Sequence, residues 1–152
     1  MLERSLNEIL EFAMDKEDEA MRFYLELSGK VKKPEIATEL KKLAEMERGH
    51  KERIKGFKEG KIELPRKGAG AATDMKIADY VVEKEVTPEM TWQNLLNVAM
   101  KRELASMRLY QDLGKLFIDE RAKALFNALA EEEAAHKNYF ETIWDEDILI
   151  EN

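Results

Sequence analysis

The sequence predicts an all-α protein, a four-helix bundle in which one long connection joins the second helix to the third. Four segments carry apolar residues at steps of four and three, the repeat of a helix face packed in a bundle. The first two of these seams recur 86 residues later, as from Glu17 to Glu103. Residues 60–90 break the pattern, whereas the other two connections are short. We therefore expect a single domain over residues 1–152, with helices at 5–31, 34–60, 92–117 and 119–144.

Capping residues justify most of the predicted helix starts. The hydroxyl of Ser5 can cap the first helix while Glu8 reaches back to complete a capping box. Pro34 fits the first turn of the second helix, where its missing N–H costs nothing. Thr91 precedes the third helix, and Asp119 can cap the fourth.

The connection over residues 60–90 contains the helix breakers Pro65, Gly68 and Gly70. Within it we expect a short helix from Ile77 to Lys84. A long link between two short ones indicates a crossover along the bundle axis, which is ferritin-like connectivity rather than an up-down-up-down bundle. The apolar tail Ile148-Leu149-Ile150 needs a surface to cover it. Together with the crossover, this tail predicts a homodimer.

Each seam is apolar at its ends and ionisable in its middle. The only two histidines both end a Glu-x-x-His motif, whose first and last residues share one helix face. Four buried carboxylates need compensating charge, and two divalent cations supply it. The sequence therefore predicts a two-metal carboxylate site formed by Glu17, Glu47, His50, Glu103, Glu133 and His136.

The chemistry of these ligands favours redox-active metals. Mixed carboxylate and imidazole ligands suit iron or manganese, and zinc is a further option. Two such ions can bind dioxygen or peroxide between them. Tyr24 and Tyr110 follow the first glutamate of each repeat by seven positions, which makes them candidate members of the site. The alternative is that they simply pack in the core. The alternative for the glutamates is a metal-free bundle with helical ion pairs, which their place in the seams disfavours.

Composition excludes several classes of protein. A net charge of −7 argues against a nucleic-acid partner. Without cysteine the 152 residues can form neither a disulfide, an iron–sulfur centre nor a Cys-x-x-Cys iron site. No apolar run approaches the roughly 20 residues of a membrane span. The N-terminal residues lack a signal-peptide pattern, so we expect a cytoplasmic protein without a membrane partner.

Nearly the whole chain resembles the ferritin-like domain of the rubrerythrin family. The resemblance rests on Glu17 to Tyr24, Glu47-x-x-His50, Glu103 to Tyr110 and Glu133-x-x-His136. The segment from Ala78-Asp79-Tyr80 through Thr87-Pro88-Glu89-Met90 is also similar to the crossover of these proteins. The resemblance implies two iron ions, bridged by Glu47 and Glu133. It also implies that Glu17 and Glu103 are terminal ligands and that each iron binds one histidine. Tyr24 and Tyr110 would donate hydrogen bonds to the carboxylates.

Two departures from the family pattern shape the functional expectation. Full-length rubrerythrins add a four-cysteine rubredoxin domain, which this sequence lacks, so electrons would come from an external donor such as rubredoxin. Many members also carry a further carboxylate on the third helix, which Met100, Ala105, Ser106 and Met107 do not supply. The resemblance implies reduction of hydrogen peroxide or dioxygen. The alternatives are a ferroxidase-type iron-handling protein, a dimanganese catalase-like enzyme, and a structural bundle whose ligands are residual.

Overall fold

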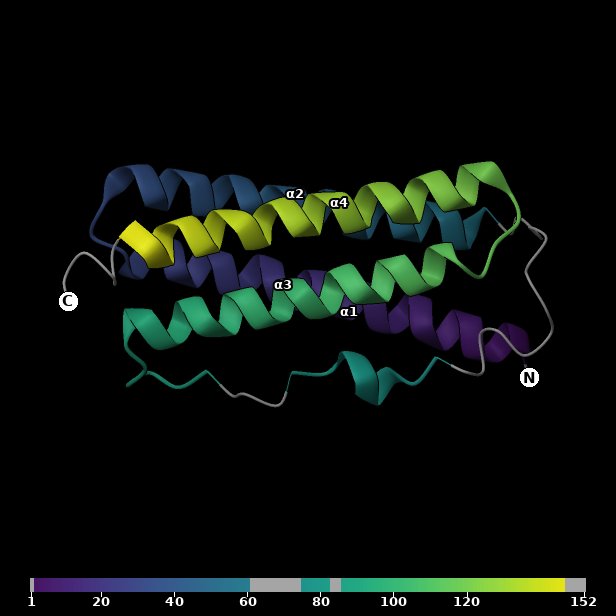
Figure 1. Cartoon of the computed structure of the whole chain (residues 1–152), viewed down its shortest axis with the longest axis horizontal. Coiled ribbons are helices and arrows are strands. Elements are labelled where there is room, and N and C mark those ends of the chain that lie inside the picture. Colours follow the sequence, from purple (N-terminus) through teal and green to yellow (C-terminus); the bar gives the residue numbers. More distant parts are fainter. Residues whose placement is uncertain (1, 61–74, 83–85, 147–152) are drawn as a thin grey trace. The chain divides into compact units, whose positions relative to one another are not determined.

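The computed structural model describes residues 2–60, 75–82 and 86–146, and these residues are almost entirely helical. In chain order the elements are α1 (Leu2–Lys30), α2 (Pro34–Glu59), the 3₁₀ helix η1 (Ile77–Tyr80), α3 (Trp92–Gly114) and α4 (Glu120–Trp144) (Figure 1). No strand occurs within the described ranges, so the predicted all-α class, consistent with a ferritin-like bundle, is confirmed. The breakers Pro65, Gly68 and Gly70 and the tail Ile148-Leu149-Ile150 lie outside the described residues.

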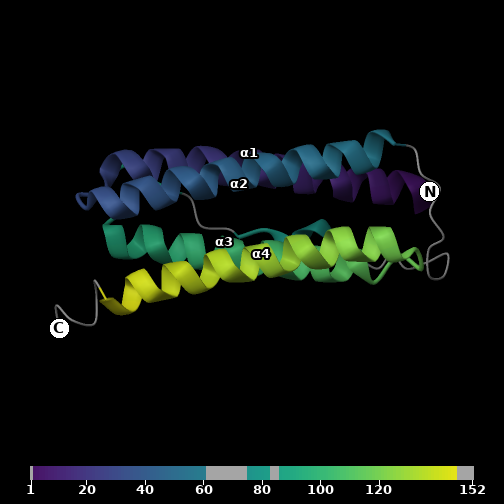
Figure 2. The same cartoon turned by 90° about the horizontal axis from the view of Figure 1, so that it is seen from above.

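The helices group into two compact units, one containing α1 and α2 and the other η1, α3 and α4. Within each unit the two long helices lie side by side and antiparallel, joined by a short turn (Figure 2). The same construction therefore occurs twice in the chain, as the repeat of 86 residues predicts. None of the helices in the described part combines the length and apolarity that a membrane crossing needs.

In the first unit, α1 begins at Leu2, three residues before the predicted start at Ser5. Leucine, glutamate and arginine are good helix formers, so the residues before Ser5 continue the helix and leave this serine inside it rather than at its cap. Pro34 is the first residue of α2, as expected. Salt bridges from Lys51 to Asp18 (2.7 Å) and from Lys58 to Glu11 join the two helices along their solvent-facing side.

In the second unit, both predicted caps are present. The Thr91 side chain accepts a hydrogen bond from the backbone N–H of Asn94 (3.1 Å). The Asp119 carboxylate accepts hydrogen bonds from the backbone N–H groups of Arg121 (2.8 Å) and Ala122 (3.2 Å). These side chains satisfy N–H groups that the first turn of a helix leaves without an intrahelical partner.

The third helix ends at Gly114 instead of the expected residue 117. A Cβ atom on Gly114 would lie 2.9 Å from Oδ1 of Asn127, so α3 approaches α4 closely at its last residue. Phe117 is nevertheless buried beyond the helix, with its ring stacked on that of Phe126 at 5.7 Å. The apolar seam therefore continues in the core after the helix has ended, which explains why periodicity alone extended the helix too far.

The short helix in the crossover is also shorter than predicted, because η1 ends at Tyr80 and the backbone is already extended at Val81. Tyr80 is buried, and its hydroxyl donates a hydrogen bond to Oδ2 of Asp112 on α3 (2.6 Å). Burial, followed by this hydrogen bond to a carboxylate, raises the pKa of Tyr80 well above its ordinary value of 10.0. The Tyr80 side chain therefore keeps its proton, and this neutral side chain attaches η1 to α3.

Candidate metal centre

The first unit brings together three of the predicted ligands, Glu17 from α1 and Glu47 and His50 from α2. We refer to these residues as the α1–α2 trio. Their exposed fractions are 2%, 1% and 2%, respectively. Nδ1 of His50 lies 3.6 Å from Oε2 of Glu17 and 3.9 Å from Oε1 of Glu47. The i, i+3 spacing places Glu47 and His50 on one face of α2, and the antiparallel partner helix brings Glu17 to the same level.

The second unit repeats this arrangement with Glu103 from α3 and Glu133 and His136 from α4, the α3–α4 trio. Their exposed fractions are 1%, 0% and 3%. Nδ1 of His136 lies 3.7 Å from Oε2 of Glu103 and 3.9 Å from Oε2 of Glu133. The sequence repeat is therefore also a repeat of geometry, with the same atom of each histidine facing both carboxylates.

The geometry of each trio fits a divalent metal ion. Within each trio the possible ligand atoms lie within 4.8 Å of one another. An ion about 2.1 Å from each of two ligand atoms spans at most about 4.2 Å, so a single ion can contact a histidine nitrogen and either neighbouring carboxylate. Two carboxylates and one imidazole are a donor set suited to iron, manganese or zinc.

Burial gives each trio an electrostatic requirement that the metal would meet. Two glutamates that are almost inaccessible to water repel each other if both are charged, and charged carboxylates in a core are costly unless paired. One divalent cation per trio balances two carboxylates while the imidazole stays neutral. An ion pair with a protonated histidine would balance only one of the two carboxylates.

The predicted tyrosines are both buried, with exposed fractions of 1% each. Tyr24 lies on α1 and Tyr110 on α3, each two helical turns beyond the glutamate of its helix. The ring of Tyr110 stacks on that of Phe126 at 6.5 Å, so core packing accounts for part of its role. Donation of hydrogen bonds from the tyrosines to the carboxylates stays a prediction.

Sequence reasoning named all six residues of the two trios, but it missed two features of the second unit. One is the hydrogen bond between Tyr80 and Asp112, which are 32 residues apart. The other is a pocket beside α3, lined in part by Lys101 and Arg108. Helical periodicity does not report on either feature, since both depend on where the crossover segment rests against a helix.

Comparison with known proteins agrees with this geometry. The family model described as Rubrerythrin matches residues 8–144, a range that contains all six residues of the two trios. No curated protein and no solved structure matches the chain.

Proposed function

The chain belongs to the rubrerythrin family, and on that premise we propose that the two trios together hold a di-iron centre that reduces hydrogen peroxide, or dioxygen, with electrons from an external donor. The observation that carries this proposal is the duplicated trio of two buried glutamates and one histidine in each helix pair. The family supplies the expectation of iron. The buried carboxylates supply the physical reason for a cation.

The number of protein ligands favours one shared centre over two independent sites. Three protein ligands leave positions open at an iron ion, which a carboxylate shared with a second ion can fill. In this proposal Glu47 and Glu133 would be the shared carboxylates, Glu17 and Glu103 would be terminal ligands, and His50 and His136 would hold one iron each. Four carboxylates then balance two divalent ions, and the complete centre is neutral.

The protein residues would hold the reactants and control access of water. When bound, two ferrous ions supply one electron each for the reduction of peroxide to water. The apolar seam residues on either side of the trios, such as Leu10 and Leu96, are buried and exclude bulk water from the centre. We propose that Tyr24 and Tyr110 donate hydrogen bonds to the ligand carboxylates, because side chains on a helix lean towards its N-terminus and hence towards Glu17 and Glu103.

The proposed centre needs an electron donor that these residues do not themselves provide. The 152 residues contain no cysteine, so they hold no cysteine-bound iron that could pass electrons on. We propose a rubredoxin-type protein as the donor, and a homodimer as the assembly. In the absence of a donor, the reduced protein should react once with peroxide and then stop in the oxidised state.

A stopped-flow experiment tests the peroxidase reaction. The ferrous protein is mixed with hydrogen peroxide or with dioxygen in separate shots, and the absorbance of the oxidised iron is followed. The proposal requires the peroxide reaction to be the faster of the two, and addition of a reduced rubredoxin-type donor to restore turnover. Dioxygen reacting at or above the rate of peroxide would reject the peroxidase function.

One structural observation favours a second candidate function. The two trios are nearly identical in geometry, and α3 offers no further carboxylate near Glu103 with which an iron could change position. Such a symmetric centre also suits a ferroxidase-type protein that handles iron without peroxidase turnover. In that case iron leaves the site after oxidation, which gel filtration followed by iron analysis of the protein fraction would detect. A dimanganese catalase-like enzyme would instead release dioxygen from peroxide when loaded with manganese.

A further inference from the structure

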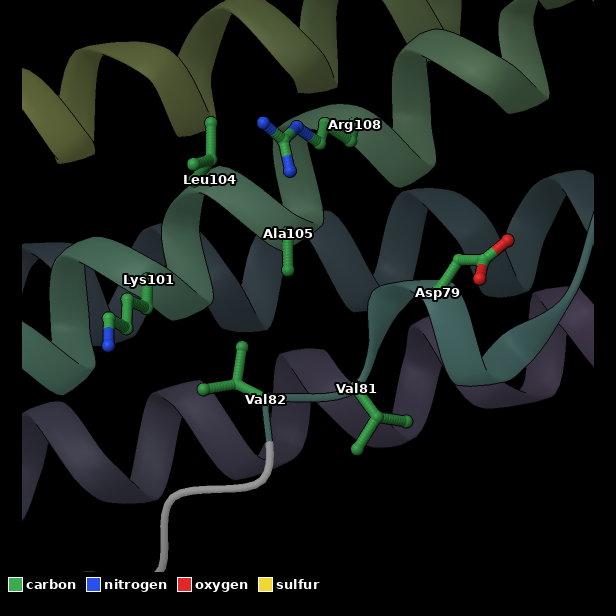
Figure 3. Close-up of a pocket in the computed structure, with 7 residues that line it drawn as sticks. All are labelled: Asp79, Val81, Val82, Lys101, Leu104, Ala105 and Arg108. Carbon is green, nitrogen blue, oxygen red and sulfur yellow. The ribbon is translucent and has the colours of Figure 1, made fainter.

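The second unit contains a pocket that the proposed metal centre does not use. It lies between α3 and the segment formed by η1 and the residues that follow it (Figure 3). Its volume is about 480 Å³, within the range of sites that bind small molecules. The lining includes four apolar residues and two basic ones, which are Val81, Val82, Leu104, Ala105, Lys101 and Arg108.

One wall of this pocket is held in place by the hydrogen bond from Tyr80 to Asp112 (2.6 Å). The backbone N–H of Val81 also donates to the carbonyl of Ala78 (3.4 Å), which closes the short helix. The chain then continues in an extended conformation, so that Val82 faces Ala105 across the pocket (Figure 3). The pocket is therefore a consequence of how η1 is attached to α3.

The charged groups around the pocket favour an anion. Lys101 and Arg108 leave α3 two helical turns apart, on either side of Ala105, and both side chains are exposed. Neither of them forms an ion pair with any residue in the described ranges. The one acidic residue of the lining, Asp79, directs its carboxylate away from Ala105 and Val82 (Figure 3). A protein of net charge −7 thus presents two basic side chains beside an apolar surface.

The sequence repeat shows that three of the lining residues on α3 depart from the pattern that the two units share. The positions of α1 equivalent to Lys101, Leu104, Ala105 and Arg108 hold Asp15, Asp18, Glu19 and Arg22. Three positions that are acidic on α1 thus hold one lysine and two apolar residues on α3. On α1 two of these acidic residues form salt bridges, Asp18 with Lys51 and Glu19 with Lys16. The same helix face is therefore used for ion pairing in one unit and lines a pocket in the other.

We propose that this pocket binds a small organic anion, whose apolar body lies against Ala105, Val81 and Val82 and whose carboxylate or sulfonate group is attracted by Lys101 and Arg108. The proposal does not depend on metal loading or on the redox reaction. It rests on the volume, the apolar lining and the two basic side chains without ion-pair partners in the described chain.

Two fluorescent probes separate the contribution of charge from that of apolar contact. The full chain is titrated with 1-anilinonaphthalene-8-sulfonate and with its uncharged analogue N-phenyl-1-naphthylamine. The double variant Lys101→Ala/Arg108→Ala should weaken binding of the sulfonate by about 2- to 25-fold, since two exposed charge contacts are lost, and should leave the neutral probe almost unaffected. Arg22→Ala, at the equivalent position of α1, is the matched control and should change neither affinity.

A second variant tests the location of the binding site. Ala105→Trp fills the pocket from α3 and should abolish binding of both probes, whereas Glu19→Trp at the equivalent position of α1 should not. Amide chemical-shift changes caused by the sulfonate should centre on residues 79–82 and 101–108. Sulfonate binding that survives both the Lys101→Ala/Arg108→Ala and the Ala105→Trp changes, or shift changes centred elsewhere, would overturn the proposal.

Discussion

Nδ1 of His50 on α2 lies 3.6 Å from Oε2 of Glu17 on α1, so a cross-helix contact completes each group of proposed ligands. The contact exists only because α1 and α2 pair antiparallel in one particular register. The same register recurs in the second unit between His136 and Glu103, at 3.7 Å. Helix pairing, and not the Glu-x-x-His motif alone, therefore assembles each trio.

Adding metal should raise the thermal stability of the metal-free protein. The apoprotein should fold, because buried apolar residues such as Leu27 and Ile54 lie about two helical turns or more along their helices from the glutamates. Fe(II), Mn(II) or Zn(II) binds only the folded state, and at 100 times its Kd stabilises it by about 2.7 kcal/mol. Differential scanning calorimetry with and without each metal checks this. A melting temperature that stays constant up to saturating metal would contradict a buried site.

Replacing Tyr80 by Phe should destabilise the second unit by about 1 kcal/mol, the typical net contribution of one hydrogen bond. The Tyr80 side chain is buried and its hydroxyl donates to Asp112, so the variant loses this bond without losing the ring. Urea unfolding near neutral pH measures the loss. A variant as stable as the parent protein would show that the bond does not hold η1 on α3.

The same variant should change the stability of the protein at alkaline pH. The folded protein raises the pKa of Tyr80 above its ordinary value of 10.0, so the folded state keeps this proton when the unfolded chain loses it. The resulting stabilisation is complete below pH 10 and is lost as pH rises towards the raised value. The free energy of unfolding should therefore fall less between pH 9 and pH 11 in Tyr80→Phe than in the parent protein. Equal slopes would argue against a raised pKa.

Tyr24→Phe and Tyr110→Phe should slow oxidation of the reduced protein without removing iron. Each change deletes one hydroxyl from a buried ring and leaves the six proposed ligands in place. Iron analysis and single-turnover absorbance traces with peroxide measure the two effects separately. Phe23→Leu is a suitable control, since it alters a buried ring beside Tyr24 but removes no hydroxyl group. Unchanged oxidation rates in both tyrosine variants would show that these residues only pack in the core.

Much of the fold follows from local sequence signals. The seams predict which faces are buried, and Pro34, Thr91 and Asp119 mark helix starts because their effect depends on the first turn alone. The start of α1 was wrong because good helix formers precede Ser5 and extend the helix past a plausible cap. The end of α3 was wrong because buried residues beyond Gly114 continue the apolar pattern without continuing the helix.

The burial of the six proposed ligands was predictable for the same reason, because all six residues sit in the periodic seams. The pocket beside α3 was not predictable, since its wall depends on a contact between Tyr80 and Asp112 that no periodicity encodes. The sequence held one usable signal, at Lys101, Leu104 and Ala105. A comparison of the two repeats shows that acidic positions on α1 are not acidic on α3.

Metal stoichiometry tests the central claim most directly. The metal-free protein is reconstituted anaerobically with Fe(II), desalted, and analysed for iron per chain, beside the variants Glu47→Ala and Glu17→Ala. We predict two ions per chain in the parent protein. The Glu47→Ala change removes a proposed bridge and should lose most of both ions. The Glu17→Ala change removes a proposed terminal ligand and should retain more iron. A parent protein that binds no iron, or a Glu47→Ala variant that keeps two tightly held ions, would contradict the account.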